Sequence, residues 1–335
     1  MPLIIVTEEP DVDFDKKYTY LMYSFLVERI GILMKTLQHC PICKSESILH
    51  DFHGRCEKFP ETQTWELYKC ESCSHGFMNP QPDFEELSEY YTEEYGPYDH
   101  ENEGSIEPLI EKAKKTGVHR DVKITPGMEI LDVGCGGGSF LRVAQSLGAK
   151  VQGVEPSEHA YKVCRSFDLP VYHGMLDDYI ADGKTNKQFD LITSSHVVEH
   201  HPDPVAFLGD MAKLLKPGGK ISIAVPNAGC FWSKQLGDHW YPIQLPFHLM
   251  QFTLQSAETL ANQSKLKLVN ISTSELPAAL AAILRTWLRH KLFIPRKLTV
   301  LLPFIFNPLS NWLSRYMDKK KQGQAIILEL DLAEK

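Results

Sequence analysis

The chain has 335 residues, of which 43% are hydrophobic and 23% charged, a composition that excludes a disordered protein and allows two domains. Its formal net charge of −8 argues against a general nucleic-acid binder, because such a protein needs a basic surface to displace counterions. No apolar run reaches the roughly 18 residues of a membrane-spanning helix, and the first residues lack the pattern of a secretory signal. We therefore expect a cytoplasmic globular protein.

The N-terminal part of the chain contains two closely spaced cysteine pairs. After an N-terminal extension over residues 1–37, residues 38–82 read as short strands and turns around two C-x-x-C sequences that are 26 residues apart. Paired cysteines in a reducing compartment more often bind metal than form disulfides, and four thiolates suit a tetrahedral zinc ion. Reduced core cysteines and a redox pair are the alternatives, and Cys56, His53 and His75 are substitute ligand candidates. The predicted ligands of a structural zinc ion are Cys40, Cys43, Cys70 and Cys73.

Strand and helix patterns alternate in the central part of the chain. Residues 83–120 are predicted to form an acidic connector and a helix, and residues 121–275 the core domain. This alternation predicts an α/β fold with a mostly parallel sheet and helices on both faces. Strands are expected at 128–133, 151–155, 170–173, 189–194, 220–225 and 266–272, and helices at 105–120, 139–147, 158–167, 205–215 and 253–264.

A glycine-rich turn follows the first strand of the core. Residues 130–141 read Ile-Leu-Asp-Val-Gly-Cys-Gly-Gly-Gly-Ser-Phe-Leu, and the glycines let the backbone approach a ligand closely. The next helix offers free N–H groups to that ligand. The dinucleotide pattern G-x-G-x-x-G would need glycine at 139, where serine stands. Glu155 ends the next strand, where a carboxylate can accept hydrogen bonds from ribose hydroxyls.

This block resembles the first S-adenosylmethionine (SAM)-binding motif of class I methyltransferases, and residues 188–192, 196–204 and 214–219 match later motifs in order. The resemblance implies a Rossmann-like sheet of seven strands, the last antiparallel. It also implies that the turn contacts the amino-acid part of SAM, that Glu155 holds the ribose, and that neighbouring loops contact the adenine and the methionine end. The cofactor-binding residues implied in this way are Asp132, Gly134, Gly136, Gly138, Glu155, Asp177, Ser195 and His196.

The resemblance extends to the N-terminal module. The sequence after the second cysteine pair resembles that of bacterial methyltransferases that carry an N-terminal zinc ribbon. The resemblance lies in residues 77–82 and in the tyrosines at 90, 91 and 95. Many of those enzymes belong to sugar, polysaccharide or secondary-metabolite pathways. The resemblance covers roughly 38–270, so it favours a small zinc ribbon attached to the methyltransferase core.

Histidines are the candidate bases for the acceptor. An oxygen or carbon acceptor must lose a proton, and histidine is the natural base near neutral pH. His200 follows Glu199 in the loop after the fourth strand, and His248 lies in the aromatic segment 238–252, which is expected to cover the substrate. These two are the predicted catalytic residues, with a structural hydrogen-bonding role as the alternative for each. The full set of candidate histidines is His200, His201, His239 and His248.

Residues 276–335 are predicted to form a basic, apolar helical segment followed by the last strand at 324–332. Within 276–321, apolar runs alternate with lysines and arginines, and Asp318 is the only acid among those cations. Such a pattern is typical of an interfacial helix that contacts a membrane surface. A lid over an apolar substrate and two helices packed on the sheet are the alternatives.

The sequence thus predicts SAM-dependent methyl transfer to a small-molecule acceptor, such as a sugar or a biosynthetic pathway intermediate, with SAM and structural zinc as cofactors. An RNA methyltransferase is one alternative, against which the acidic balance argues. A non-catalytic SAM-binding protein is the other, against which the intact glycines and Glu155 argue.

Overall fold

The computed structural model describes residues 35–55, 64–82, 106–183, 188–275, 277–294 and 302–333. These ranges include both C-x-x-C pairs and almost all of the predicted core domain. The N-terminal extension up to residue 34, Cys56 and the tyrosines at 90, 91 and 95 lie outside the described residues.

A seven-stranded sheet forms the centre of the molecule, in the order β12-β13-β10-β9-β6-β7-β8. Strand β13 runs antiparallel to both of its neighbours, and the pairs among β10, β9, β6, β7 and β8 are parallel. The predicted α/β sheet with an antiparallel last strand is confirmed. The strands are β6 (Glu129–Val133), β7 (Lys150–Glu155), β8 (Val171–His173), β9 (Phe189–Ser195), β10 (Leu215–Pro226), β12 (Leu266–Ser274) and β13 (Ala325–Leu332).

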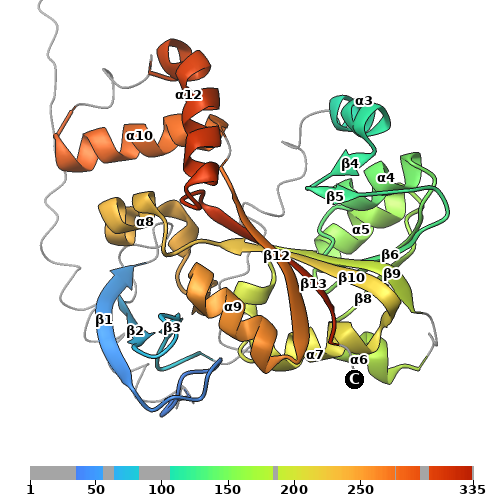
Figure 1. Ribbon diagram of the computed structural model, residues 1–335, viewed down its shortest axis with the longest axis horizontal. Coiled ribbons are helices and arrows are strands. Elements are labelled where there is room, and N and C mark those ends of the chain that lie inside the picture. The colour runs from blue at the N-terminus through green and yellow to red at the C-terminus, as the bar shows by residue number, and fades with distance from the viewer. Residues whose placement is uncertain are drawn as a thin grey trace, which may run out of the picture.

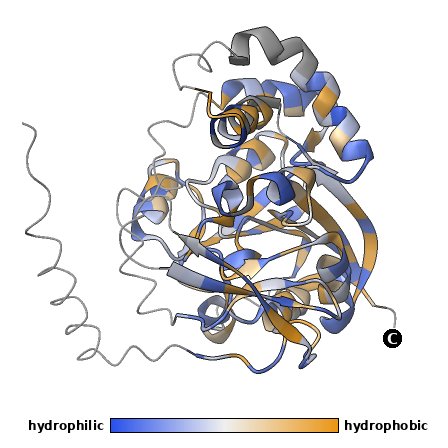
Figure 2. Cartoon of the chain, turned by 90° about the vertical axis from the view of Figure 1, so that its left-hand side faces the viewer, coloured by the Kyte–Doolittle hydropathy of each residue, from blue (hydrophilic) through white to orange (hydrophobic). Residues whose placement is uncertain are grey.

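Helices cover both faces of this sheet (Figure 1). On one face α4 (Ser139–Ser146) and α5 (Glu158–Ser166) pack on β7, and α3 (Glu107–Thr116) packs on α4. On the other face α7 (Pro204–Lys213) contacts β10 and α6 (Leu176–Ala181), while α9 (Leu254–Gln263) contacts β12 and β13. Apolar residues gather along the strands between these helices (Figure 2), which is the burial that holds the layers together.

Local signals explain where the helices begin. Ser157 accepts a hydrogen bond from the N–H of Ala160 and so caps α5, and Asp203 caps α7 in the same way through Ala206. The predicted helix at 205–215 was placed too far along the chain: α7 ends at Lys213, because Leu215 already pairs with Phe189 as part of β10. The Lys-Pro-Gly-Gly sequence at 216–219 is an irregularity in that pairing rather than a separate turn.

The N-terminal module shares its sheet with the core. Strands β1 (Ile48–Arg55), β2 (Thr64–Cys70) and β3 (Gly76–Met78) are antiparallel, and β11 (Met250–Gln251) of the core completes the sheet beside β3. A Cβ at Gly76 would lie 2.9 Å from the Cβ of Gln251, so glycine allows this close pairing. The module is therefore held directly against the segment that follows His248.

Two helices extend above the end of β12 (Figure 1). Helix α10 (Pro277–Lys291) packs on α12 (Leu302–Lys319) and on α8 (Phe231–Leu236), while α12 also contacts β12. Phe293, just after α10, and Trp312 of α12 are mostly exposed. Within the described ranges, no helix combines the length and the apolar character needed to cross a membrane.

Candidate active site

The glycine turn joins β6 to α4 at the carboxyl end of the parallel strands. Gly134, Gly136 and Gly138 all have positive φ, at 71°, 53° and 80°. A Cβ at Gly134 would also collide with the side chain of Val197. The turn therefore needs glycine both for its backbone conformation and for its packing against the loop after β9.

Glu155 connects this turn to the start of α5. One carboxylate oxygen accepts a hydrogen bond from the N–H of Gly136 at 2.8 Å, and the other accepts one from the N–H of Ser157 at 2.9 Å. Burial raises the pKa of Glu155. Because a carboxylate offers about four lone-pair sites, it can still accept hydrogen bonds from two ligand hydroxyls. This arrangement fits a ribose.

Asp132 lies two residues before the turn and is buried. Its Oδ1 accepts a hydrogen bond from the hydroxyl of Thr193 at 2.7 Å. Among the described residues its Oδ2 has no hydrogen-bond partner. Burial raises the pKa of Asp132 to about 6, because desolvation penalises the charged form and a single hydroxyl offsets little of that penalty.

In the loop after β9, Glu199 occupies the centre of a histidine cluster. It belongs to the 3-10 helix Val198–His200, and its side chain is fully buried. His196 Nδ1 lies 3.2 Å from Glu199 Oε1, and His248 Nε2 lies 3.9 Å from the same oxygen. Burial acts to raise the pKa of Glu199, but the hydrogen bond with His196 and the nearby histidines outweigh it and lower the pKa to about 2. Glu199 is therefore ionised at neutral pH.

The two predicted catalytic histidines lie side by side, although they are 48 residues apart in sequence. Their ring centroids are 4.7 Å apart and the rings are nearly perpendicular. His200 Nδ1 donates to the carbonyl of Phe247 at 2.8 Å, and His248 Nδ1 donates to that of Pro242 at 2.7 Å. Burial lowers both pKa values, that of His248 to about 3. Both rings are therefore neutral at pH 7, and the lone pair of His248 is on Nε2, while the His200 side chain also hydrogen-bonds the main chain of His196.

The remaining predicted residues are placed less centrally. His201 Nδ1 accepts from the N–H of Asp203, and His239 is half exposed beside Asp238. Asp177 is exposed in the first turn of α6, and Ser195 is half-buried at the end of β9.

The sequence interpretation includes Glu199 only as the neighbour of His200. Its position directly before a histidine after the fourth strand was the available signal, but its burial was not evident.

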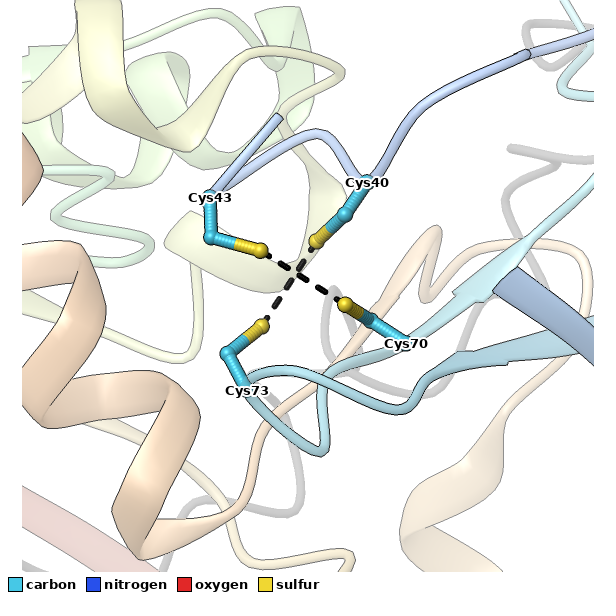
Figure 3. Close-up of side chains that lie close together, drawn as sticks. All are labelled: Cys40, Cys43, Cys70 and Cys73. Atoms are coloured by element: carbon cyan, nitrogen blue, oxygen red, sulfur yellow. Dashed lines mark hydrogen bonds between the residues drawn. The ribbon is translucent and has the colours of Figure 1, made fainter. Parts of the chain in front are cut away.

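Four cysteine sulfurs converge at the end of the N-terminal module (Figure 3). Cys40 Sγ lies 3.6 Å from Cys73 Sγ, and Cys43 Sγ lies 3.5 Å from Cys70 Sγ. A tetrahedral zinc ion with four thiolate ligands would place the sulfurs about 3.8 Å apart, so the cluster fits this ion closely. The hydrogen bond from Cys73 lowers the pKa of Cys40, which favours the thiolate form that binds metal.

The two histidines suggested as substitute ligands do not join this cluster. His75 is buried, with its Nε2 3.3 Å from the sulfur of Met250 and its ring against Phe252. His53 is exposed and lies against His50, and Cys56 is outside the described residues. The metal-binding geometry of the module therefore belongs to the two C-x-x-C pairs.

A family model described as a methyltransferase domain matches residues 98–268. The chain belongs to this family. The matched range contains the glycine turn, Glu155 and the whole histidine cluster, whereas the four cysteines precede it. The methyltransferase domain therefore carries both groups of residues described above.

Two curated proteins have sequences similar to that of this methyltransferase. The ubiquinone biosynthesis O-methyltransferase of Idiomarina loihiensis is 39% identical over 106 residues, which cover 30% of this chain and 43% of that protein. The mitochondrial ubiquinone biosynthesis O-methyltransferase of Homo sapiens is 37% identical over 117 residues, covering 32% of this chain and 31% of its own length. The chain thus spans less than half the length of these relatives.

Solved structures with a related chain path are more distant. A SAM-dependent methyltransferase from Archaeoglobus fulgidus has 18% identity and a TM-score of 0.44, covering 74% of this chain and 99% of that one. A cyclopropane synthase from Mycobacterium tuberculosis has 18% identity and a TM-score of 0.41, and the match covers 67% of this chain and 82% of that one.

Proposed function

We propose that this methyltransferase transfers the methyl group of SAM to an oxygen atom of a small molecule, a sugar or another biosynthetic intermediate. The observation that carries the proposal is the carboxylate of Glu155, which accepts hydrogen bonds from both the glycine turn and the start of α5. The choice of oxygen is supported by the curated relatives, which are named O-methyltransferases.

The donor side is proposed to hold SAM in one orientation. SAM supplies an electrophilic methyl group on a sulfonium, and the protein aligns that methyl with the acceptor, which can lower the barrier by several kcal/mol. In this proposal the turn at Gly134, Gly136 and Gly138 holds the amino-acid part, and Glu155 the ribose. Asp132 supports the glycine turn, and Asp177 lies by the adenine of SAM. Ser195 and His196 border the methionine end of SAM.

The acceptor side is proposed to promote loss of the acceptor proton. His200 and His248 are neutral, adjacent and held by main-chain carbonyls of the same loop. In the simplest arrangement one imidazole accepts the proton as a general base. Segment 238–252 covers the acceptor in this proposal, since it contributes His248 and the carbonyls that fix both rings. If the double variant of His200 and His248 to Ala kept full turnover, the histidine pair would have no part in this step.

Calorimetry with SAM tests the donor site. The wild-type chain should bind SAM, and Glu155→Gln should bind it about tenfold more weakly, since a hydrogen bond to a charged group contributes about 1.5 kcal/mol or more. Glu158→Gln is the matched control, because Glu158 is exposed on α5 and pairs with Lys162. Lack of SAM binding by the wild type would contradict the proposal. Methyl-transfer assays over sugar nucleotides, lipids and phenolic intermediates would then identify the acceptor.

We also propose that the four cysteines bind a structural zinc ion. The near-tetrahedral spacing of their sulfurs supports this assignment. Four protein ligands leave no open position, so the ion would stabilise the module and take no part in methyl transfer. A module of this size buries too little surface to be stable alone, and metal binding would supply folding free energy.

We also propose a peripheral membrane contact through residues 276–321. The exposed Trp312 and Phe293, together with the lysines at the end of α12, support it. Flotation with anionic liposomes tests it, and absence of binding at low salt would remove it.

A further inference from the structure

Three side chains on the acceptor side converge in a second cluster of metal-ligating groups. Glu199, His200 and His248 each offer one ligand atom, and these atoms all lie within 4.8 Å of one another. Glu199 and His200 come from the 3-10 helix after β9, and His248 comes from the loop before β11. The tertiary fold, not a local sequence motif, brings the three together.

The two histidines are held as metal ligands usually are. A metal-binding histidine almost always donates its second ring N–H to a carbonyl or a carboxylate, which fixes the ring and its tautomer. His200 donates from Nδ1 to the carbonyl of Phe247, and His248 does so to the carbonyl of Pro242. A carbonyl can only accept, so Nδ1 donates in both hydrogen bonds and Nε2 of His248 is left to face an ion. The His200 side chain also hydrogen-bonds the main chain of His196, a bond that ion binding would have to replace.

The carboxylate of Glu199 supplies an independent observation. Its side chain is fully buried, and among the described residues its Oε2 has no hydrogen-bond partner. A carboxylate oxygen left without a partner in the interior is costly, and a cation beside it would remove that cost. His196 Nδ1, 3.2 Å from Oε1, holds the other oxygen of the same carboxylate in place.

From this geometry we infer that Glu199, His200 and His248 bind a divalent transition-metal ion, such as Zn²⁺, Fe²⁺ or Co²⁺, separate from the cysteine site. Two imidazoles and one carboxylate suit these ions better than Mg²⁺ or Ca²⁺, which prefer oxygen ligands. Ligand atoms around a tetrahedral ion lie about 3.3 Å apart, whereas those of the three residues lie within 4.8 Å of one another, so binding must close these distances by up to about 1.5 Å. The Glu199 oxygen that lies 3.9 Å from His248 Nε2 is Oε1, so binding through Oε2 also needs a rotation of the carboxylate.

Three protein ligands leave coordination positions open, as in catalytic rather than structural metal sites. The inference rests on the proposed function, since it gives the histidine pair a role in acceptor binding through the ion instead of direct proton transfer. An ion at this place would make an acceptor hydroxyl more acidic. The acceptor class that fits best is therefore one with an oxygen able to ligate the ion.

Cobalt binding to the full chain tests the inference. The chelator-treated protein is titrated with Co²⁺, and the bound metal is counted after dialysis while the absorption spectrum is recorded. We expect two ions per wild-type chain: one with the intense near-ultraviolet absorption of thiolate ligands, and one with only the weak visible bands of nitrogen and oxygen ligands. Glu199→Gln and His248→Ala should each lose the second ion and keep the first. His239→Ala, a half-exposed histidine of the same segment, should keep both.

A wild-type chain that binds one Co²⁺, with the thiolate spectrum alone, would overturn the inference. So would a second ion that persists in folded Glu199→Gln and His248→Ala. The thiolate band and SAM calorimetry report folding of the variants, and the wild-type count decides the matter if a variant fails to fold. SAM binding without a second ion would remove the metal site alone, whereas a second ion without SAM binding would remove the proposed function alone.

Discussion

The proposed donor side and the proposed acceptor side of this molecule are built in different ways. On the donor side, a glycine turn and Glu155 lie within a short stretch of chain and act through backbone N–H groups and a carboxylate. On the acceptor side, side chains from the loop after β9 meet a side chain from the loop before β11. The first site depends on local conformation, and the second depends on how distant segments pack.

Two buried carboxylates show the same difference in electrostatic terms. Asp132 has one hydroxyl partner, and burial raises its pKa to about 6. Glu199 is equally buried, but the surrounding histidines lower its pKa to about 2. The neighbours of a buried acid therefore decide its charge, and burial alone does not.

In the described part of the chain, the N-terminal module shares a sheet with only one of these two sides. Strand β3 pairs with β11, and β11 begins two residues after His248. The glycine turn, by contrast, is packed against Val197 and linked through Glu155 to the start of α5, and it has no strand in common with the module. The cysteine cluster should therefore matter for the acceptor side and little for SAM.

Cys73→Ser should give the largest effect and the clearest separation of the two sides. Loss of one thiolate should release zinc and unfold the module, since structural zinc binding contributes about 10 kcal/mol or more in small zinc domains. We expect methyl transfer to fall below about one-tenth of wild type, while the dissociation constant for SAM stays within about twofold. Metal analysis, an activity assay and calorimetry measure the three quantities.

Ser72→Ala is the control for this variant, because Ser72 lies in the same C-x-x-C turn and is exposed. It should retain zinc and turnover. An equal loss of SAM affinity and turnover in Cys73→Ser would show that the module also supports the donor side, and the comparison would fail.

Gly134→Ala tests the donor side directly. The positive φ of 71° costs about 1–2 kcal/mol for a residue with a Cβ, and the collision with Val197 adds a similar amount. If the turn relaxes to relieve this strain, SAM binding must restore its conformation at a cost of up to the sum, about 3 kcal/mol, so we expect binding weaker by up to roughly 100-fold in calorimetry. Gly127→Ala is matched to it, since Gly127 has a φ of 85° but a Cβ added there would have no atom within 4 Å. If both variants bind SAM alike, the packing of the turn on Val197 is unimportant.

The same contrast explains how much the sequence revealed. The donor side was predictable, because the strand at 129–133, the glycines and Glu155 follow one another along the chain and each has a local physical signature. The strands of the main sheet were also predictable, since apolar runs bounded by turns alternate with helical patterns.

The acceptor side was only partly predictable. His200 and His248 both stand out in the sequence, but nothing local indicates that their rings lie 4.7 Å apart or that Glu199 is buried between histidines. The pairing of Met250 with Phe77 is likewise a tertiary contact between segments more than 170 residues apart. Periodicity also could not place the end of α7, because sheet pairing of Leu215 with Phe189 decides it.

Asp132→Asn should give the smallest effect, seen in the pH dependence of stability. The folded pKa of Asp132 is raised from 3.8 to about 6, so the native state binds more protons than the unfolded state between these values. Its contribution to the free energy of unfolding is therefore present at low pH and falls by about 2 kcal/mol between pH 4.5 and pH 7. Asn cannot titrate, so the variant should lack this fall in denaturant titrations.

Asp190→Asn is the control, and its change in the pH dependence of stability should have the opposite sign. The N–H of Glu129 and the ammonium of Lys216 hold the pKa of Asp190 below its usual range. Parallel pH curves for wild type and Asp132→Asn would show that Asp132 is better solvated than its burial implies, and the electrostatic contrast with Glu199 would then disappear.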